Sequence, residues 1–194
     1  MSTFLTPEDV SDGISLLVSV NPLFRDMNLK IYVIANEYAG SFTQKKKSKK
    51  HRQILQDAVL RAEKKESVVK SVSTTLMITE YSGHAEVLAR KIVEATVEHR
   101  KKGDFTLIVS AGGDGTSLEI QMAVYKMAQK SKTVNKIVMN DIAVLRLPFG
   151  TGCDGTDGHE FEDTVKLLEN QIHFENSRAV KVWHEGTPTK EDFM

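Results

Sequence analysis

Residues 110–116 combine three glycines with one aspartate, Asp114, between an apolar run and a helical pattern. Glycine has no Cβ, so the backbone N–H groups of such a loop can face a phosphate at close range. A carboxylate in a phosphate-binding loop repels the anion unless a cation or a hydroxyl lies between them. The combination therefore predicts nucleotide phosphoryl chemistry that involves a metal ion.

The loop differs from a Walker-type P-loop, because no Gly-Lys-Ser/Thr follows it. Phosphate charge would have to be neutralised by backbone N–H groups, by the N-terminus of the following helix and by a metal ion. Taken alone, the pentapeptide 112–116 is also compatible with a purely structural turn between a strand and a helix. Its position directly after a buried strand favours phosphate binding.

The composition is that of an ordinary globular protein, with 194 residues of which 40% are hydrophobic and 27% charged. Lys and Arg together number 26, as do Asp and Glu, so the charge gives no indication of nucleic acid and we expect no nucleic-acid partner. The single cysteine, Cys153, excludes an internal disulfide and fits a reducing compartment. Without an apolar run of about 20 residues or a basic signal-peptide start, the sequence predicts a cytoplasmic protein with no transmembrane segment.

Strand and helix patterns alternate along the chain, which predicts an α/β fold in three layers, a parallel sheet covered by helices on both faces. The strands are expected at 30–35, within 68–79, and at 105–109, 142–147 and 178–183. The helices are expected from Pro7 with Thr6 as N-cap, at 48–66, from 82–84 to about 102, at 117–129 and at 160–170. Cations and a glycine at 101–103 indicate the end of the third helix.

Ligands of such sheets bind beyond the carboxyl ends of the strands. The loops at 36–41, 110–116 and 148–158 are therefore expected to converge on one crevice. A basic run at 45–50 is compatible with either a solvated loop and helix start or contact with anionic lipid. Among the histidines, we expect His84 to satisfy a backbone group at a helix start. The others, which show no ligand spacing, are expected at the surface: His51, His99, His159, His173 and His184.

Four ordered motifs resemble the diacylglycerol kinase catalytic-domain family, which includes sphingosine and ceramide kinases and soluble bacterial lipid kinases. Gly-Gly-Asp-Gly-Thr at 112–116, with Glu119, resembles its nucleotide loop. Leu-Pro-Phe-Gly-Thr-Gly-Cys-Asp at 147–154 is similar to its Leu-Pro-x-Gly-Thr-Gly-Asn-Asp. Thr79 with Gly-His-Ala at 83–85 resembles its Thr…Gly-His-Ala segment, and Asn36 opens a segment similar to its Asn-Pro-x-x-Gly.

The resemblance implies a phosphofructokinase-like and NAD-kinase-like domain that binds ATP with Mg²⁺. The nucleotide-binding residues that it implies are Asn36, Thr79, Gly112, Gly113, Asp114, Gly115, Thr116 and Glu119. The residues that it places where the phosphate region meets the acceptor are Gly150, Thr151, Gly152 and Asp154. Asp114 would be catalytic, acting through Mg²⁺ or orienting the attacking hydroxyl. Two departures are Cys153 in place of the asparagine of the family and Glu37 in place of its proline.

The same resemblance divides the chain into a lead-in at 1–28, an ATP-binding domain at 29–183 and a truncated connection at 184–194. A C-terminal β-sandwich domain, which in the family completes the catalytic site, would follow. We therefore expect the chain to be an N-terminal part of a longer protein and inactive alone.

The function that the resemblance implies is an ATP-dependent lipid kinase that meets its lipid substrate at a membrane surface. Cytoplasmic or peripheral membrane localisation and a homodimer are compatible with it. The alternatives are an NAD kinase-like enzyme, whose Asn-x-Gly-x-x-Gly-Phe pattern the chain lacks, and a non-catalytic nucleotide-binding or regulatory module. Residues 150–155 also fit Gly-x-Gly-x-x-Gly, but they occur in the last strand–helix unit rather than the first, which disfavours a dinucleotide-binding oxidoreductase.

Overall fold

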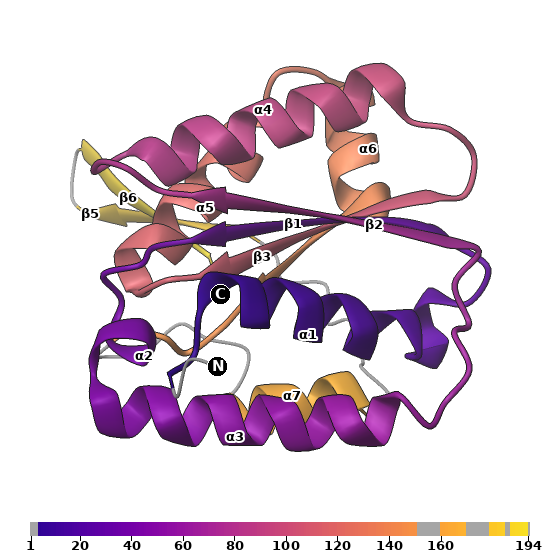
Figure 1. Ribbon diagram of the computed structural model, residues 1–194. Coiled ribbons are helices and arrows are strands. Elements are labelled where there is room, and N and C mark those ends of the chain that lie inside the picture. The colour runs from indigo at the N-terminus through magenta and orange to yellow at the C-terminus, as the bar shows by residue number, and fades with distance from the viewer. Residues whose placement is uncertain (1–3, 151–159, 170–178, 185–186, 194) are drawn as a thin grey trace.

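The computed structural model describes residues 4–150, 160–169, 179–184 and 187–193, the last two segments by the course of their backbone (Figure 1). Its centre is a parallel sheet in the order β2-β1-β3-β4. The strands are β1 (Asn28–Ala35), β2 (Ser71–Ile78), β3 (Asp104–Ala111) and β4 (Ile142–Arg146). The four strands predicted before residue 148 are thus confirmed.

Helices cover both faces of this sheet, so the predicted three-layer α/β fold is confirmed (Figure 1). One face carries α1 (Pro7–Ser19), α3 (Lys45–Ala62) and α7 (Phe161–Glu169). The other face carries α4 (His84–His99), α5 (Asp114–Ala128) and α6 (Lys132–Asp141). Each face has its own apolar cluster, and the sheet separates the two.

Helix α1 begins where the sequence places it. The Thr6 side chain accepts a hydrogen bond from the Asp9 N–H at 3.2 Å, and the Asp9 carboxylate accepts one from the Thr6 N–H at 3.0 Å. This reciprocal capping box satisfies two N–H groups that an uncapped helix would leave open. The helix buries Val10, Ile14 and Leu17 completely, so it belongs to the core on its face of the sheet.

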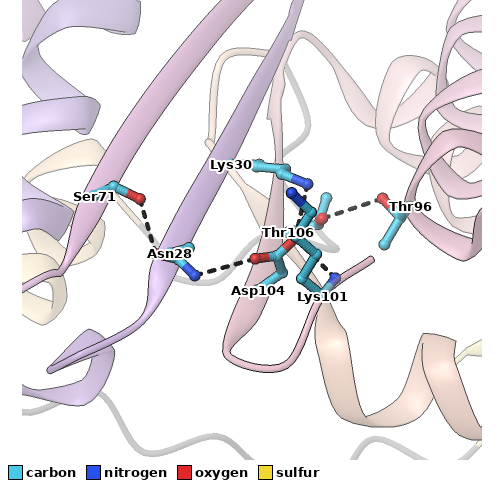
Figure 2. Close-up of polar contacts among 7 residues, drawn as sticks. All are labelled: Asn28, Lys30, Ser71, Thr96, Lys101, Asp104 and Thr106. Carbon is cyan, nitrogen blue, oxygen red and sulfur yellow. Dashed lines mark hydrogen bonds and ion pairs between the residues drawn. The ribbon is translucent and has the colours of Figure 1, made fainter. Parts of the chain in front are cut away.

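A polar network joins β1 and β3 at the amino edge of the sheet (Figure 2). The Asp104 carboxylate accepts hydrogen bonds from Lys30 Nζ at 2.9 Å and Asn28 Nδ2 at 3.2 Å. Lys30, the Lys101 backbone N–H and Asn28 together lower the pKa of Asp104 below its usual value. On the other side, Ser71 Oγ donates to Asn28 Oδ1 at 3.0 Å and ties in β2. The network therefore aligns three strands at the edge opposite the three convergent loops.

Several element boundaries differ from the prediction. Helix α5 begins at Asp114 rather than 117, because Gly113 is its N-cap and the glycine loop enters the first turn. Helix α3 begins at Lys45, so the basic run is helical from its first residue. Helix α4 ends at His99, and the predicted cap, Gly103, lies in the turn beyond it with φ of 89°.

Four elements were not predicted, the first of them a short 3₁₀ helix, η1 (Pro22–Phe24). A short helix, α2 (Gly40–Thr43), occupies the end of the predicted loop 36–41. Helix α6 is capped by Ser131, whose Oγ accepts from the Val134 N–H at 3.2 Å. The strand predicted at 178–183 is present as β5 (Ala179–His184), and it pairs antiparallel with an unpredicted strand, β6 (Thr187–Phe193), in a separate two-stranded sheet. The segment interpreted as a connection after residue 183 therefore contains a strand.

Candidate functional site

Hydrogen bonds join the three loops at the carboxyl edge of the sheet. The Asn36 N–H donates to the Ala111 carbonyl at 3.1 Å, which links the first loop to the second. The Ser41 N–H donates to the Phe149 carbonyl at 3.2 Å, which links the first to the third. The predicted convergence of the loops is confirmed as far as Gly150. Since β1 and β3 are the neighbours at which the strand order reverses, this is the edge where doubly wound sheets bind ligands.

The two glycine segments lie in direct backbone contact. A Cβ on Gly150 would stand 2.9 Å from the Gly113 Cα and 3.4 Å from the Asp114 nitrogen. A Cβ on Gly112 would stand 2.5 Å from Thr116 Oγ1. Both contacts are shorter than a real side chain tolerates, so these two positions require glycine for packing.

The N-terminus of α5 forms one wall of this contact. No side chain of the described segments caps it, which leaves the N–H groups of its first turn, from Asp114 to Thr116, for a ligand. The helix dipole adds partial positive charge at the same point. A Cβ on Gly115 would meet no described atom within 4 Å. The wall therefore fits a phosphate group, which uncapped N–H groups at a helix N-terminus bind readily.

Asp114 is the one carboxylate within the glycine loop. It is half-buried, and it makes no hydrogen bond or ion pair with any residue that the structure describes. Among those residues, no three His, Cys, Asp or Glu side chains form a cluster that could hold a metal ion. Asp114 nevertheless fits Mg²⁺, which commonly takes one or two carboxylates and completes its shell with substrate phosphates and water.

A buried pair of hydroxyl groups joins the two ends of the glycine loop. Ser110, at the end of β3, and Ser117, in the first turn of α5, approach each other to 2.9 Å between their hydroxyl oxygens. Both residues are buried. The pair fixes where the helix leaves the strand, and sequence reasoning missed it because neither serine has a distinctive motif position.

Glu119 and Thr79 lie at the neighbouring loop after β2. The Thr79 N–H donates to the Ala35 carbonyl at 2.9 Å, which continues the pairing of β2 with β1. Glu119 Oε1 accepts from the Gly83 N–H at 2.9 Å, so this carboxylate ties α5 to the start of α4. Their predicted contact with nucleotide stays a prediction.

His84 satisfies a backbone group, as predicted. Its Nδ1 accepts a hydrogen bond from the Glu80 N–H at 3.0 Å, and its ring stacks on Tyr81 with centroids 4.4 Å apart. The imidazole therefore shapes the loop between β2 and α4.

Thr151, Gly152 and Asp154, together with Cys153, lie outside the described residues. Their predicted place at the junction of phosphate and acceptor therefore stays a prediction. Gly150, the last described residue of this motif, lies against the phosphate loop as stated above.

His51 is buried, which corrects the expectation that it lies at the surface. Only 2% of the residue is exposed, and its ring stacks on Phe161 with centroids 4.8 Å apart. Burial first, and then the charges of Lys47 and Lys50, lower the pKa of His51 from 6.5 to about 4, against an opposing effect of Glu160. His51 is therefore neutral near neutral pH.

This burial predicts a loss of stability in weak acid. An unfolded His51 gains its proton below about pH 6.5, whereas the folded protein resists protonation down to about pH 4. The free energy of unfolding should therefore fall by up to about 3 kcal/mol across this window and be unaffected by His51 above it. Urea unfolding of the wild type and of His51→Phe, from about pH 7 down to about pH 4.5, measures the effect. The difference between the two curves must vary with pH, since other groups contribute equally to both, and a constant difference would contradict the assignment.

The chain matches a known protein family. The family model described as diacylglycerol kinase catalytic domain matches residues 30–183, well over half of the chain. The matched region begins in β1 and includes every loop of the candidate site, while α1 precedes it. No curated protein matches the chain.

Proposed function

Because the chain belongs to the diacylglycerol kinase catalytic-domain family, we propose that it works as an ATP-dependent lipid kinase that transfers the γ-phosphate to a lipid hydroxyl. Family membership shows a lipid-kinase-like catalytic domain; the nucleotide, the metal and the lipid are the proposal. The observation that carries it is the backbone contact of Gly113 with Gly150 at the uncapped N-terminus of α5.

The residues around this contact would each have a role in transfer of the phosphate. Backbone N–H groups of the first turn of α5 bind and orient the phosphates, and Gly112 allows Thr116 to pack beneath them. Asp114 would hold Mg²⁺ or orient the attacking hydroxyl. Bound Mg²⁺ supplies charge neutralisation at the transferred phosphoryl group. Positioning and electrostatics of this kind are most of what phosphoryl transfer requires.

The direct test is transfer of labelled phosphate from ATP to extracted lipids by the full-length natural protein in the presence of Mg²⁺. Labelled product in the lipid phase supports the proposal. NAD as the acceptor serves as the control, and label on NAD instead of lipid would replace the proposal with an NAD kinase. Binding of ATP without transfer to either acceptor would favour a nucleotide-binding module.

A membrane surface is the proposed place of the reaction, and α3 offers the charge for it. Lys45, Lys46 and Lys49 lie exposed on its first turns and form no ion pair with a described residue. Lys49 Nζ instead lies 5.7 Å from the centre of the Phe4 ring. No described helix is long and apolar enough to cross a membrane, so contact through this helix would be peripheral.

Replacing these three lysines with glutamine should weaken binding to vesicles that contain phosphatidylserine by about tenfold or more, since each basic residue near an anionic surface contributes about 1 kcal/mol. Co-sedimentation with vesicles of phosphatidylcholine alone, or mixed with phosphatidylserine, measures the binding. The matched control replaces Lys64, Lys101 and Lys102, which are equally exposed but lie away from the site. Equal losses in both variants would show a net-charge effect and refute a docking surface on α3.

A further inference from the structure

Two lysines in the first turns of α3 contact the chain at Gly150 and at Glu160. Lys47 Nζ donates to the Gly150 carbonyl at 2.7 Å, and Lys50 Nζ pairs with Glu160 Oε2 at 3.2 Å. Gly150 and Glu160 stand ten positions apart in the sequence. Two lysines of the basic run, Lys47 and Lys50, therefore contact the chain on either side of residues 151–159.

Aromatic rings complete the same attachment. The His51 ring lies against Phe149, with centroids 5.8 Å apart, and stacks on Phe161 at 4.8 Å. Phe149 and Phe161 also contact each other edge to face at 5.2 Å. All three residues are at most 2% exposed. The ring of His51 thus packs between the residues that precede Gly150 and follow Glu160.

The polar ring of His51 is an unexpected choice for this position. Its Nδ1 is buried and has no hydrogen-bond partner among the residues that the structure describes, an arrangement that costs free energy relative to an apolar ring. The charged groups that face it are Lys47 and Lys50 from α3 and Glu160 before α7. His51 therefore contributes to this packing through the shape of its uncharged ring.

The backbone carbonyls of Phe149 and Gly150 both accept hydrogen bonds, one from α2 and one from α3. The Ser41 N–H donates to the Phe149 carbonyl at 3.2 Å, and Lys47 binds the next carbonyl. An ammonium donor makes a stronger hydrogen bond than a neutral one. The two donors hold the backbone of Gly150 at the place where a Cβ would stand 2.9 Å from the Gly113 Cα.

We propose that Lys47 and His51 are positioning residues that hold Phe149 and Gly150 against the phosphate loop. The hydrogen bond from Lys47 and the ring contact of His51 fix the separation between Gly150 and Gly113. That separation sets the shape of the phosphate site, so nucleotide affinity depends on side chains that do not touch the nucleotide. The effect on nucleotide rests on the proposed function, whereas the effect on the two glycines does not.

The experiment compares Lys47→Met, which keeps the length of the side chain, with Lys47→Arg, which keeps the charge and a donor. Lys64→Met, an exposed lysine just beyond the other end of α3, is the control. The backbone amide resonances of Gly113 and Gly150 are recorded by NMR, and Mg-ATP affinity is titrated. All measurements are made at a temperature at which every variant is fully folded.

Lys47→Met should shift both glycine resonances and weaken Mg-ATP binding by about tenfold, the effect of about one hydrogen bond. Lys47→Arg should restore most of the affinity, and Lys64→Met should change neither quantity. His51→Phe should retain affinity because it keeps a ring, and His51→Ala should shift the Gly113 resonance. An unchanged Gly113 resonance in Lys47→Met would overturn the proposal. If the wild type binds no ATP, the proposed function fails while the resonances still test the attachment.

Discussion

Replacing Asp114 with asparagine should lower phosphate transfer from ATP to lipid by about a hundredfold or more, the usual effect of removing one group that stabilises charge in a transition state. Folding should change little, because Asp114 has no side-chain partner in the described part of the chain. Its negative charge in the first turn of α5 contributes at most about 1 kcal/mol through the helix dipole. Initial rates of labelled-phosphate transfer measure the first effect, and urea unfolding measures the second.

The matched control is Asp12→Asn, the same chemical change at an exposed position of α1. It should leave the rate and the stability unchanged. If Asp114→Asn retains a rate within about threefold of the wild type, Asp114 neither holds the metal nor orients the hydroxyl. A loss of rate that follows a loss of stability would instead assign Asp114 to folding.

The sheet and its site-bearing edge were predictable because they follow from local signals. Val33 and Val109, both completely buried, belong to the short apolar runs that form β1 and β3. Parallel strands that alternate with helices end at the same edge, so the loops after them had to converge. The Thr6 cap was equally local, since one residue and its neighbour three positions on complete it.

The start of α5 could not be read locally. Gly115 disfavours a helix by its propensity, so the sequence placed the helix after the glycines. Tertiary contacts decide otherwise: Thr116 packs beneath Gly112, and Ser117 bonds with Ser110. The first turn is therefore built by packing against the end of β3.

His51 and Lys47 show the same limit for the site. Lys47 stands in a run of cations, and nothing in that run distinguishes the lysine that binds Gly150 from its exposed neighbours. For His51 a signal existed, because Leu55 and Ala58 lie on the buried face of α3 and the helical period extends that face back to His51. Because histidine is polar, the sequence predicted a surface position for His51 despite this signal. Its ring contacts with Phe149 and Phe161 account for its burial.

The role of the glycine loop can be separated from its packing by Gly115→Ala. A Cβ at this position would meet no atom of the described residues within 4 Å, and the backbone is helical. Alanine should therefore leave the free energy of unfolding unchanged or raise it by up to about 1 kcal/mol. If phosphate occupies the space before the α5 N-terminus, the same methyl group should weaken Mg-ATP binding by about tenfold or more, because close approach to the backbone is lost.

Gly112→Ala is the contrasting variant, because its Cβ would meet Thr116 Oγ1 at 2.5 Å and Thr116 Cβ at 2.6 Å. It should lose both stability, by about 1–3 kcal/mol as overpacked sites do, and nucleotide binding. Urea unfolding and calorimetric titration with Mg-ATP, applied to both variants, give four values. Only a nucleotide at the α5 N-terminus predicts that Gly115→Ala keeps its stability and loses its affinity. Full affinity in Gly115→Ala would place the phosphates elsewhere and leave Gly112, Gly113 and Gly150 with a role in packing alone.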